Sequence, residues 1–266
     1  MGRKRYQGDS KPTGFLKPLT PKNEVQAAYM DMLKESTITF GLGPAGTGKT
    51  FLASHVALEA LLDHEVDKII LTRPIVAVED IGYLPGDMNE KIHPYMMPLF
   101  DALEDHLGPT KAKELLEAGK IEIIPLAFMR GRSLNRAFII LDEAQNTTPE
   151  QMKMFLTRLG YDAKMAINGD LAQSDLPRHQ VPVNGLDWAS ERLRACDGEI
   201  NMIEFRGKHI VRNPLIATML ARLEGPAEDR RPAYDKPTQP SAIGRAMAMG
   251  MPARTPFKSA ALLSAD

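Results

Sequence analysis

The chain contains a single cysteine, Cys196, among its 266 residues. One thiol cannot form an intramolecular disulfide, and it cannot supply the ligands of a four-cysteine zinc site. The sequence also lacks a run of roughly 18 uninterrupted apolar residues, which a membrane-spanning helix needs. The first residues, MGRKRYQGDSKPTG, are basic but lack the apolar stretch of a secretory signal peptide. These absences predict a protein of the reducing cytoplasm with no membrane partner.

A strong net charge is absent as well, because 33 Lys and Arg stand against 34 Asp and Glu. The balance is uneven along the chain: residues 1–22 carry six basic residues against one acid, and residues 225–266 carry six against four. The middle of the chain is therefore acidic, which is the opposite of what nucleic-acid-binding domains usually show. Any binding of nucleic acid has to rest on a local basic patch or on the two ends.

Composition divides the chain into three parts. Residues 1–21 mix Lys, Arg, Pro and Gly without apolar periodicity, which predicts a flexible basic arm. Residues 225–266 are rich in Pro and Ala and poor in β-branched residues, which predicts a disordered tail. Between them, residues 22–224 alternate short β-branched runs with helical patterns and are expected to form one domain.

The apolar patterns of this middle part predict strands that alternate with helices. The expected strands are apolar enough to be buried on both faces, and they cover residues 36–42, 67–72, 120–126, 137–142 and 163–169. Helical spacing of apolar residues marks residues 50–64, 94–107, 148–160, 184–196 and 213–225. Glycine and proline in residues 82–95 predict a loop. This alternation favours an α/β fold with a mostly parallel sheet flanked by helices.

Residues 43–50, GPAGTGKT, match the phosphate-binding pattern G-x-x-x-x-G-K-[ST] and lie between an expected strand and an amphipathic helix. Glycine permits backbone with positive φ and close approach to an anion, while the N-terminus of the next helix attracts phosphate. Lys49 is expected to reach the β- and γ-phosphates, and the Thr50 hydroxyl to ligate Mg²⁺. The residues expected to hold the nucleotide in and beside this loop are Gly43, Pro44, Ala45, Gly46, Thr47, Gly48, Lys49, Thr50 and Phe51.

Two further motifs follow expected strands. In AFIILDEAQ, Asp142 comes at the carboxyl end of a buried strand, where α/β sheets bind ligands, and is expected to hold Mg²⁺. Glu143 is then expected to orient and deprotonate the attacking water, although an Asp-Glu pair in this position is often only a helix cap. In INGDLAQ, Gln173 has a spacing that lets its amide face the γ-phosphate as a sensor. The adjacent acid pair favours hydrolysis over phosphotransfer to a small molecule.

The ordered set GPAGTGKT, DEAQ and GDLAQ resembles the first motor domain of superfamily-one helicases. More closely, residues from about 22 to 224 resemble the PhoH family of ATPases, through stretches such as GPAGTGKTFLA, IILTRPIV and IEIIPLAFMRGRSLNRAFIILDEAQNTTPEQMKMFLTRLG. The resemblance implies a RecA-like P-loop NTPase fold, hydrolysis of ATP with Mg²⁺, and a ring of identical subunits, often hexameric.

The resemblance also implies roles for two residues outside these motifs. Gln26 falls where helicase-like proteins place a glutamine that reads adenine, although an ordinary helix capped by Asn23 explains the same stretch. Arg212 falls where the related helicases have an arginine that touches the γ-phosphate, in its own subunit or a neighbouring one. His209 and Asn213 depart from the usual family pattern around it.

Three more arginines stand in compact basic islands. Arg73, in LTRP, follows a strand, and Arg130 and Arg132 flank a glycine in FMRGRSL. All three are interpreted as candidate contacts to a nucleic-acid backbone or a neighbouring subunit, and Arg130 and Arg132 also as candidates to reach into an adjacent nucleotide site. Plain solvated charges are the alternative.

Two main functions stay open on the sequence. The first is an oligomeric ATPase that remodels single-stranded RNA or DNA, most simply RNA, in a helicase-like manner. The second is an ATP-dependent regulatory switch that binds protein partners without moving along a strand. A phosphotransferase acting on a small metabolite is a third and weaker reading.

Overall fold

The computed structural model describes residues 16–75, 88–177, 181–194 and 198–211, together with residues 179, 196, 215, 219 and 222. The chain divides into two units, Met1–Arg212 and Asn213–Asp266. The sheet and its covering helices belong to the first unit. In the second unit, the three described residues are all helical, and they are Leu215, Met219 and Arg222.

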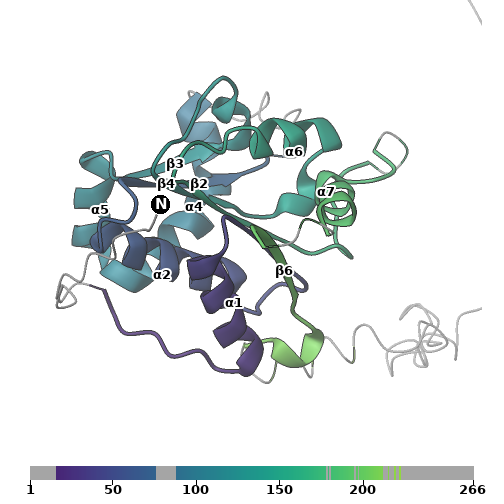
Figure 1. Ribbon diagram of the computed structural model, residues 1–266, viewed down its shortest axis with the longest axis horizontal. Helices are drawn as coiled ribbons and strands as arrows, with labels where there is room; N and C mark the ends of the chain where they lie inside the picture. The colour runs from purple at the N-terminus through teal and green to yellow at the C-terminus, as the bar shows by residue number, and fades with distance from the viewer. Residues whose placement is uncertain are drawn as a thin grey trace, which may run out of the picture. The chain divides into compact units, whose positions relative to one another are not determined.

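Six parallel strands form the sheet of the first unit, in the order β3-β2-β4-β5-β1-β6 (Figure 1). Their bounds are β1 (Ile38–Leu42), β2 (Lys68–Arg73), β3 (Ile121–Pro125), β4 (Ala137–Leu141), β5 (Lys164–Gly169) and β6 (Ile200–Glu204). The five strands expected from the sequence are confirmed as β1 to β5. The central strands β1, β4 and β5 are buried almost throughout, which explains their nearly continuous apolar sequences.

Helices cover both faces of this sheet (Figure 1). One face packs against α1 (Glu24–Glu35), α2 (Lys49–Leu62), α4 (Met88–Leu107) and α5 (Pro109–Glu117). The other face packs against α6 (Pro149–Leu156) and α7 (Gly185–Leu193), with the short 3-10 helices η1 (Leu126–Met129) and η2 (Ala144–Asn146). A third 3-10 helix, η3 (Gly207–His209), follows β6. The α/β, RecA-like P-loop NTPase fold expected from the sequence is thereby confirmed.

Two N-terminal caps agree with sequence signals. The Asn23 side chain accepts a hydrogen bond from the Gln26 backbone N–H and begins α1. Thr148 and Gln151 form a reciprocal capping box at the start of α6, which is worth about 1 kcal/mol to a helix. No helix among the described residues is both long enough and apolar enough to cross a membrane.

The loop expected over residues 82–95 is wrong from Met88 onward, because α4 begins there and runs to Leu107. Residues 76–87 lie outside the described residues. Pro94 and Pro98 interrupt the backbone hydrogen bonding of α4. Their cost is outweighed by burial on one face of the helix, where the exposed fractions are at most 8% for Ile92, Met96, Leu99 and Leu103.

Sequence patterns missed α5 and β6. The nine-residue α5 buries little beyond Ala112, and β6 is a half-buried edge strand, so neither carries a strong apolar signal. Of the helix expected over residues 213–225, most lies outside the described residues.

Only residues 16–21 of the expected basic arm are described, and they lie against the end of α4. The Lys17 backbone N–H donates to the His106 carbonyl at 3.3 Å, and its Nζ donates to the Asp105 carbonyl at 2.7 Å. The division into arm, domain and tail at residues 21 and 224 stays a prediction.

Candidate nucleotide site

The glycine-rich loop joins the carboxyl end of β1 to the first turn of α2, as expected for phosphate binding. Gly43 has φ of 130° and Gly48 has φ of 89°, values that L side chains rarely adopt. A Cβ at Gly43 would also collide with the carbonyl oxygen of Phe205, so the loop fits closely against the segment after β6. The loop is held to the sheet by the Gly43 N–H, which donates to the Gly169 carbonyl at 2.9 Å.

Lys49 is the first residue of α2 and is only 9% exposed. Its Nζ donates to the carbonyl oxygens of Gly43 at 2.5 Å and Pro44 at 2.9 Å. The ammonium group therefore lies across the mouth of its own loop. This is a position from which it can reach a phosphate chain lying on the loop.

Thr50 and Asp142 meet although they stand 92 residues apart in the sequence. The Thr50 hydroxyl donates to Asp142 Oδ1 at 2.5 Å, and the Asp142 backbone N–H donates to the Thr72 carbonyl at 2.9 Å. Burial raises the pKa of Asp142, and the neighbouring Glu143 charge raises it further, while Thr50 and Arg73 act in the opposite direction. A hydroxyl and a partly desolvated carboxylate at one point suit Mg²⁺, which is commonly held by one or two protein oxygens alongside phosphates and waters.

Glu143 adopts the left-handed backbone conformation, with φ 51° and ψ 42°. This region is uncommon for a non-glycine residue, although His64, Arg136 and Asp162 adopt it as well, away from the hollow. Glu143 stands at the N-cap of η2 but makes no side-chain cap bond there. Helix capping therefore does not account for its carboxylate.

Gln145 is a site residue that sequence reasoning missed. It is 3% exposed, its Nε2 donates to Glu143 Oε2 at 2.5 Å, and its Oε1 accepts from the Asp170 N–H at 3.1 Å. One amide therefore joins the second motif to the third. Its place inside DEAQ was visible in the sequence, but its burial between two strands was not.

A hollow of about 220 Å³ lies where the three motifs converge. Residues from the loop, from the end of β4 and from the end of β5 line it, and they are Ala45, Gly46, Gly48, Lys49, Thr50, Phe51, Asp142, Glu143, Gly169, Asp170 and Gln173. The Gln173 N–H donates to the Asp170 carbonyl at 3.2 Å, which sets the turn that places Gln173 on this lining.

Gln26 lies beside the loop but is already engaged. Its Oε1 accepts from the Lys22 N–H at 2.8 Å, and its Nε2 donates to the Thr47 carbonyl at 2.9 Å. The side chain is 4% exposed and ties α1 to the glycine-rich loop. The adenine-reading role stays a prediction.

The three candidate arginines that the structure describes do not gather at one point. Arg73 lies 3.6 Å from Glu143, whereas Arg132 pairs with Glu122 on β3 at 2.7 Å and Arg130 is exposed on the loop after η1. Arg212 lies outside the described residues. Its neighbour Val211 donates its N–H to the Gly46 carbonyl at 2.8 Å.

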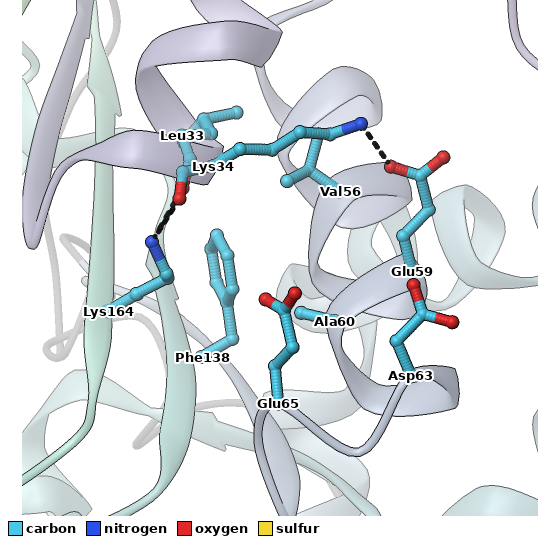
Figure 2. Close-up of a pocket in the computed structure, with 9 residues that line it drawn as sticks. All are labelled: Leu33, Lys34, Val56, Glu59, Ala60, Asp63, Glu65, Phe138 and Lys164. Atoms are coloured by element: carbon cyan, nitrogen blue, oxygen red, sulfur yellow. Dashed lines mark hydrogen bonds and ion pairs between the residues drawn. The ribbon is translucent and has the colours of Figure 1, made fainter. Parts of the chain in front are cut away.

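A second hollow, of about 210 Å³, lies at the opposite edge of the sheet, beside the amino ends of β4 and β5 (Figure 2). Lys164 Nζ points to the end of α1 and donates to the carbonyl oxygens of Lys34 at 2.5 Å and Ser36 at 3.3 Å. Across the hollow, Lys34 Nζ pairs with Glu59 at 2.9 Å (Figure 2). These contacts cap α1 and join it to α2, so this hollow is explained by packing.

A glycine-rich loop facing an acid pair across one edge of a parallel sheet places the first unit among the P-loop NTPases by fold. The family described as PhoH-like protein matches residues 18–224. The chain belongs to this family.

Two relatives give the extent of the likeness. The PhoH-like protein of Bacillus subtilis is 52% identical over 205 residues, which cover 77% of this chain and 63% of the relative. Protein PhoH of Escherichia coli K12 is 44% identical over 218 residues, or 81% of this chain and 61% of the relative. The match thus spans a little over three fifths of these curated relatives. The solved Pif1 helicase of Candida albicans is 13% identical over 77% of this chain and 44% of its own, with a TM-score of 0.40, and this weak likeness carries no functional information.

Proposed function

We propose that this chain binds ATP together with Mg²⁺ and hydrolyses the bond to the γ-phosphate. The observation that carries the proposal is the 2.5 Å contact between Thr50 and Asp142 in a hollow that Lys49, Glu143 and Gln173 also line. Phosphate-loop, metal and water-activating groups are needed at one place for this chemistry.

Each residue has a distinct task in the proposal. Lys49 and the backbone N–H groups of the loop hold the phosphates, and Thr50 and Asp142 hold the metal ion. Glu143 orients the attacking water and takes its proton, and Gln173 contacts the γ-phosphate through its amide. Bound Mg²⁺ supplies positive charge that offsets the phosphate oxygens and the Asp142 carboxylate.

The substitution Lys49→Ala tests the site. ATP turnover is expected to fall below detection, because the phosphates lose their principal cation. The matched control is Lys153→Ala, an exposed lysine on α6, which should leave turnover within twofold. Unchanged hydrolysis in Lys49→Ala contradicts the proposal.

We further propose that the chain works as a homo-oligomer. Among the described residues, no arginine lines the hollow, whereas hydrolysis of this kind gains about 10³–10⁵ in rate from one. Arg212 of the same or a neighbouring subunit would supply it. Mixing Arg212→Ala subunits with Glu143→Gln subunits separates the two cases, since only an arginine acting across an interface restores turnover in the mixture.

The proposed partner is single-stranded nucleic acid, and RNA is the first candidate to test. Arg130 is exposed where the chain leaves η1, after the carboxyl end of β3, and is the candidate contact to the nucleic-acid strand. Turnover should rise with single-stranded RNA, and the rise should fade as salt increases. Turnover that ignores RNA and DNA but responds to a protein partner supports the regulatory-switch alternative, which the acidic middle of the chain favours.

A further inference from the structure

The Glu143 carboxylate is held from two sides. Gln145 Nε2 donates to its Oε2 at 2.5 Å, and Arg73 Nη2 lies 3.6 Å from its Oε1. Both oxygens are therefore engaged while the side chain still lines the hollow. The glutamate does not sample its rotamers freely, as an unsupported residue at this place would.

The sheet itself brings Arg73 to Glu143. Strands β2 and β4 are neighbours in parallel register, with Thr72 opposite Leu141. The Asp142 N–H extends this ladder by one bond to the Thr72 carbonyl. In this register Arg73 stands opposite Asp142, and Glu143 follows Asp142 by one residue beyond the carboxyl end of β4. The pairing of β2 with β4 therefore brings Arg73 beside the acid pair.

This ion pair is a weak source of stability. The two side chains are 26% and 36% exposed, and pairs of this kind contribute little because solvent screens them. At 3.6 Å the contact is also longer than a direct hydrogen bond. The main effect of Arg73 is therefore to orient the Glu143 carboxylate. Arg136 and Asp67 form a shorter pair, at 2.8 Å, just before the amino ends of β4 and β2. Neither residue lines the nucleotide hollow, so this pair is a suitable control.

We propose that Arg73 is a positioning residue for Glu143, which it aims at the attacking water from within its own subunit. This inference rests on the proposed hydrolysis. It assigns Arg73 to the hydrolytic site, whereas the sequence pointed to a nucleic-acid or interface contact. A misplacement of about 1 Å can cost on the order of 100-fold in rate, so a weak pair can still matter to catalysis.

The test compares Arg73→Gln and Arg73→Lys with the control Arg136→Gln. Arg73→Gln is expected to lower kcat for ATP by about 10- to 100-fold while KM and the affinity for a fluorescent ATP analogue change less than threefold. Arg73→Lys should recover part of kcat, because it restores the charge without the planar fork. Arg136→Gln should match the wild type.

Full kcat in Arg73→Gln overturns the inference. So does a joint loss of kcat, nucleotide affinity and unfolding midpoint, since that pattern indicates a structural role. A variant that keeps kcat but loses binding to a fluorescent oligouridylate returns Arg73 to the strand-contact role and also overturns the inference.

A second measurement needs no turnover. Unfolding free energies of the nucleotide-free wild type, Arg73→Gln, Glu143→Gln and the double variant form a cycle, and a small non-additive change is expected because the pair is screened. Changes that add within the error of replicate titrations overturn the contact. If the wild type fails to hydrolyse ATP, the proposed function fails, and only the cycle then tests whether Arg73 and Glu143 interact. An interacting pair in a protein without ATP turnover contradicts a positioning role.

Discussion

Charged residues are arranged differently at the amino ends and at the carboxyl ends of the strands, which are the amino edge and the carboxyl edge of the sheet. At the amino edge, Lys34 is paired with Glu59, and Lys164 is satisfied by the carbonyl oxygens at the end of α1. At the carboxyl edge, Asp142 and Glu143 are adjacent like charges that line a hollow. Natural proteins tolerate such unfavourable arrangements mainly where function needs them. The comparison separates an edge arranged for stability from one arranged for a ligand.

The largest expected effect is on turnover, at the carboxyl edge. Asp142→Asn should lower ATP turnover by about 100-fold or more, because a metal ligand worth several kcal/mol is weakened. The unfolding midpoint without nucleotide should stay the same or rise, since burial and Glu143 raise the pKa of the Asp142 carboxyl and so disfavour its charged form. A calorimetric midpoint that falls together with turnover contradicts the distinction between the edges.

The second-largest expected effect is a loss of stability in acid, caused by a histidine near the glycine-rich loop. His106 on α4 stacks on Phe51 at 4.0 Å and contacts its carbonyl through Nε2 at 2.9 Å. Burial lowers the pKa of His106 from 6.5 to about 4. The unfolded chain therefore binds the proton first, and about 3 kcal/mol of stability is lost as pH falls from 6.5 toward 4.

His106→Gln should flatten this acid limb in denaturant titrations between pH 7 and 4. His55 also has its pKa lowered by burial and leaves a smaller residual slope. The control is His93→Gln, an exposed histidine of the same helix. An acid limb that is equally steep in His106→Gln shows that other groups cause it.

At the amino edge the expected effect is on stability alone. Lys164→Met removes the donor to the last carbonyl oxygens of α1 and should cost about 1–3 kcal/mol of unfolding free energy. ATP turnover and affinity should stay within twofold of the wild type. Lys153→Met, at an exposed position on α6, serves as the control. Lost turnover in a Lys164→Met protein that remains folded would mean that the two edges are coupled.

The smallest expected effect is at the same hollow. Glu59→Gln weakens the pair with Lys34, whose side chain is 50% exposed, so the change in unfolding free energy should not exceed about 1 kcal/mol. A larger loss in a denaturant titration would show that this pair is less screened than its exposure implies.

The sequence predicted the parts of the fold that carry local signals. Strands β1, β4 and β5 are buried on both faces and read as continuous apolar runs, and Asn23 and Thr148 carry capping chemistry in adjacent residues. By contrast, the start of α4, residues 88–93, was predicted as a loop although the helix from Pro94 onward was expected, because the local residues there carry only a weak helical pattern. Burial against the sheet depends on residues that are distant in the sequence, so local sequence patterns do not predict it.

The same division holds at the candidate site. The contiguous loop and the Asp142–Glu143 pair could be recognised from their spacing alone. Gln145 and the partner of Arg73 could not, because both depend on which strands lie side by side in the sheet. Single polar residues become meaningful only when the register of β2, β4 and β5 is known.

The central claim is that Lys49, Thr50, Asp142 and Glu143 act on one Mg²⁺-bound triphosphate. A crystal structure of the Glu143→Gln variant with ATP and Mg²⁺ tests it most directly. The account predicts an intact nucleotide with its phosphates on the 43–50 loop, and a metal ion beside the Thr50 hydroxyl and the Asp142 carboxylate. A nucleotide bound elsewhere, or a metal ion that contacts neither residue, would contradict it.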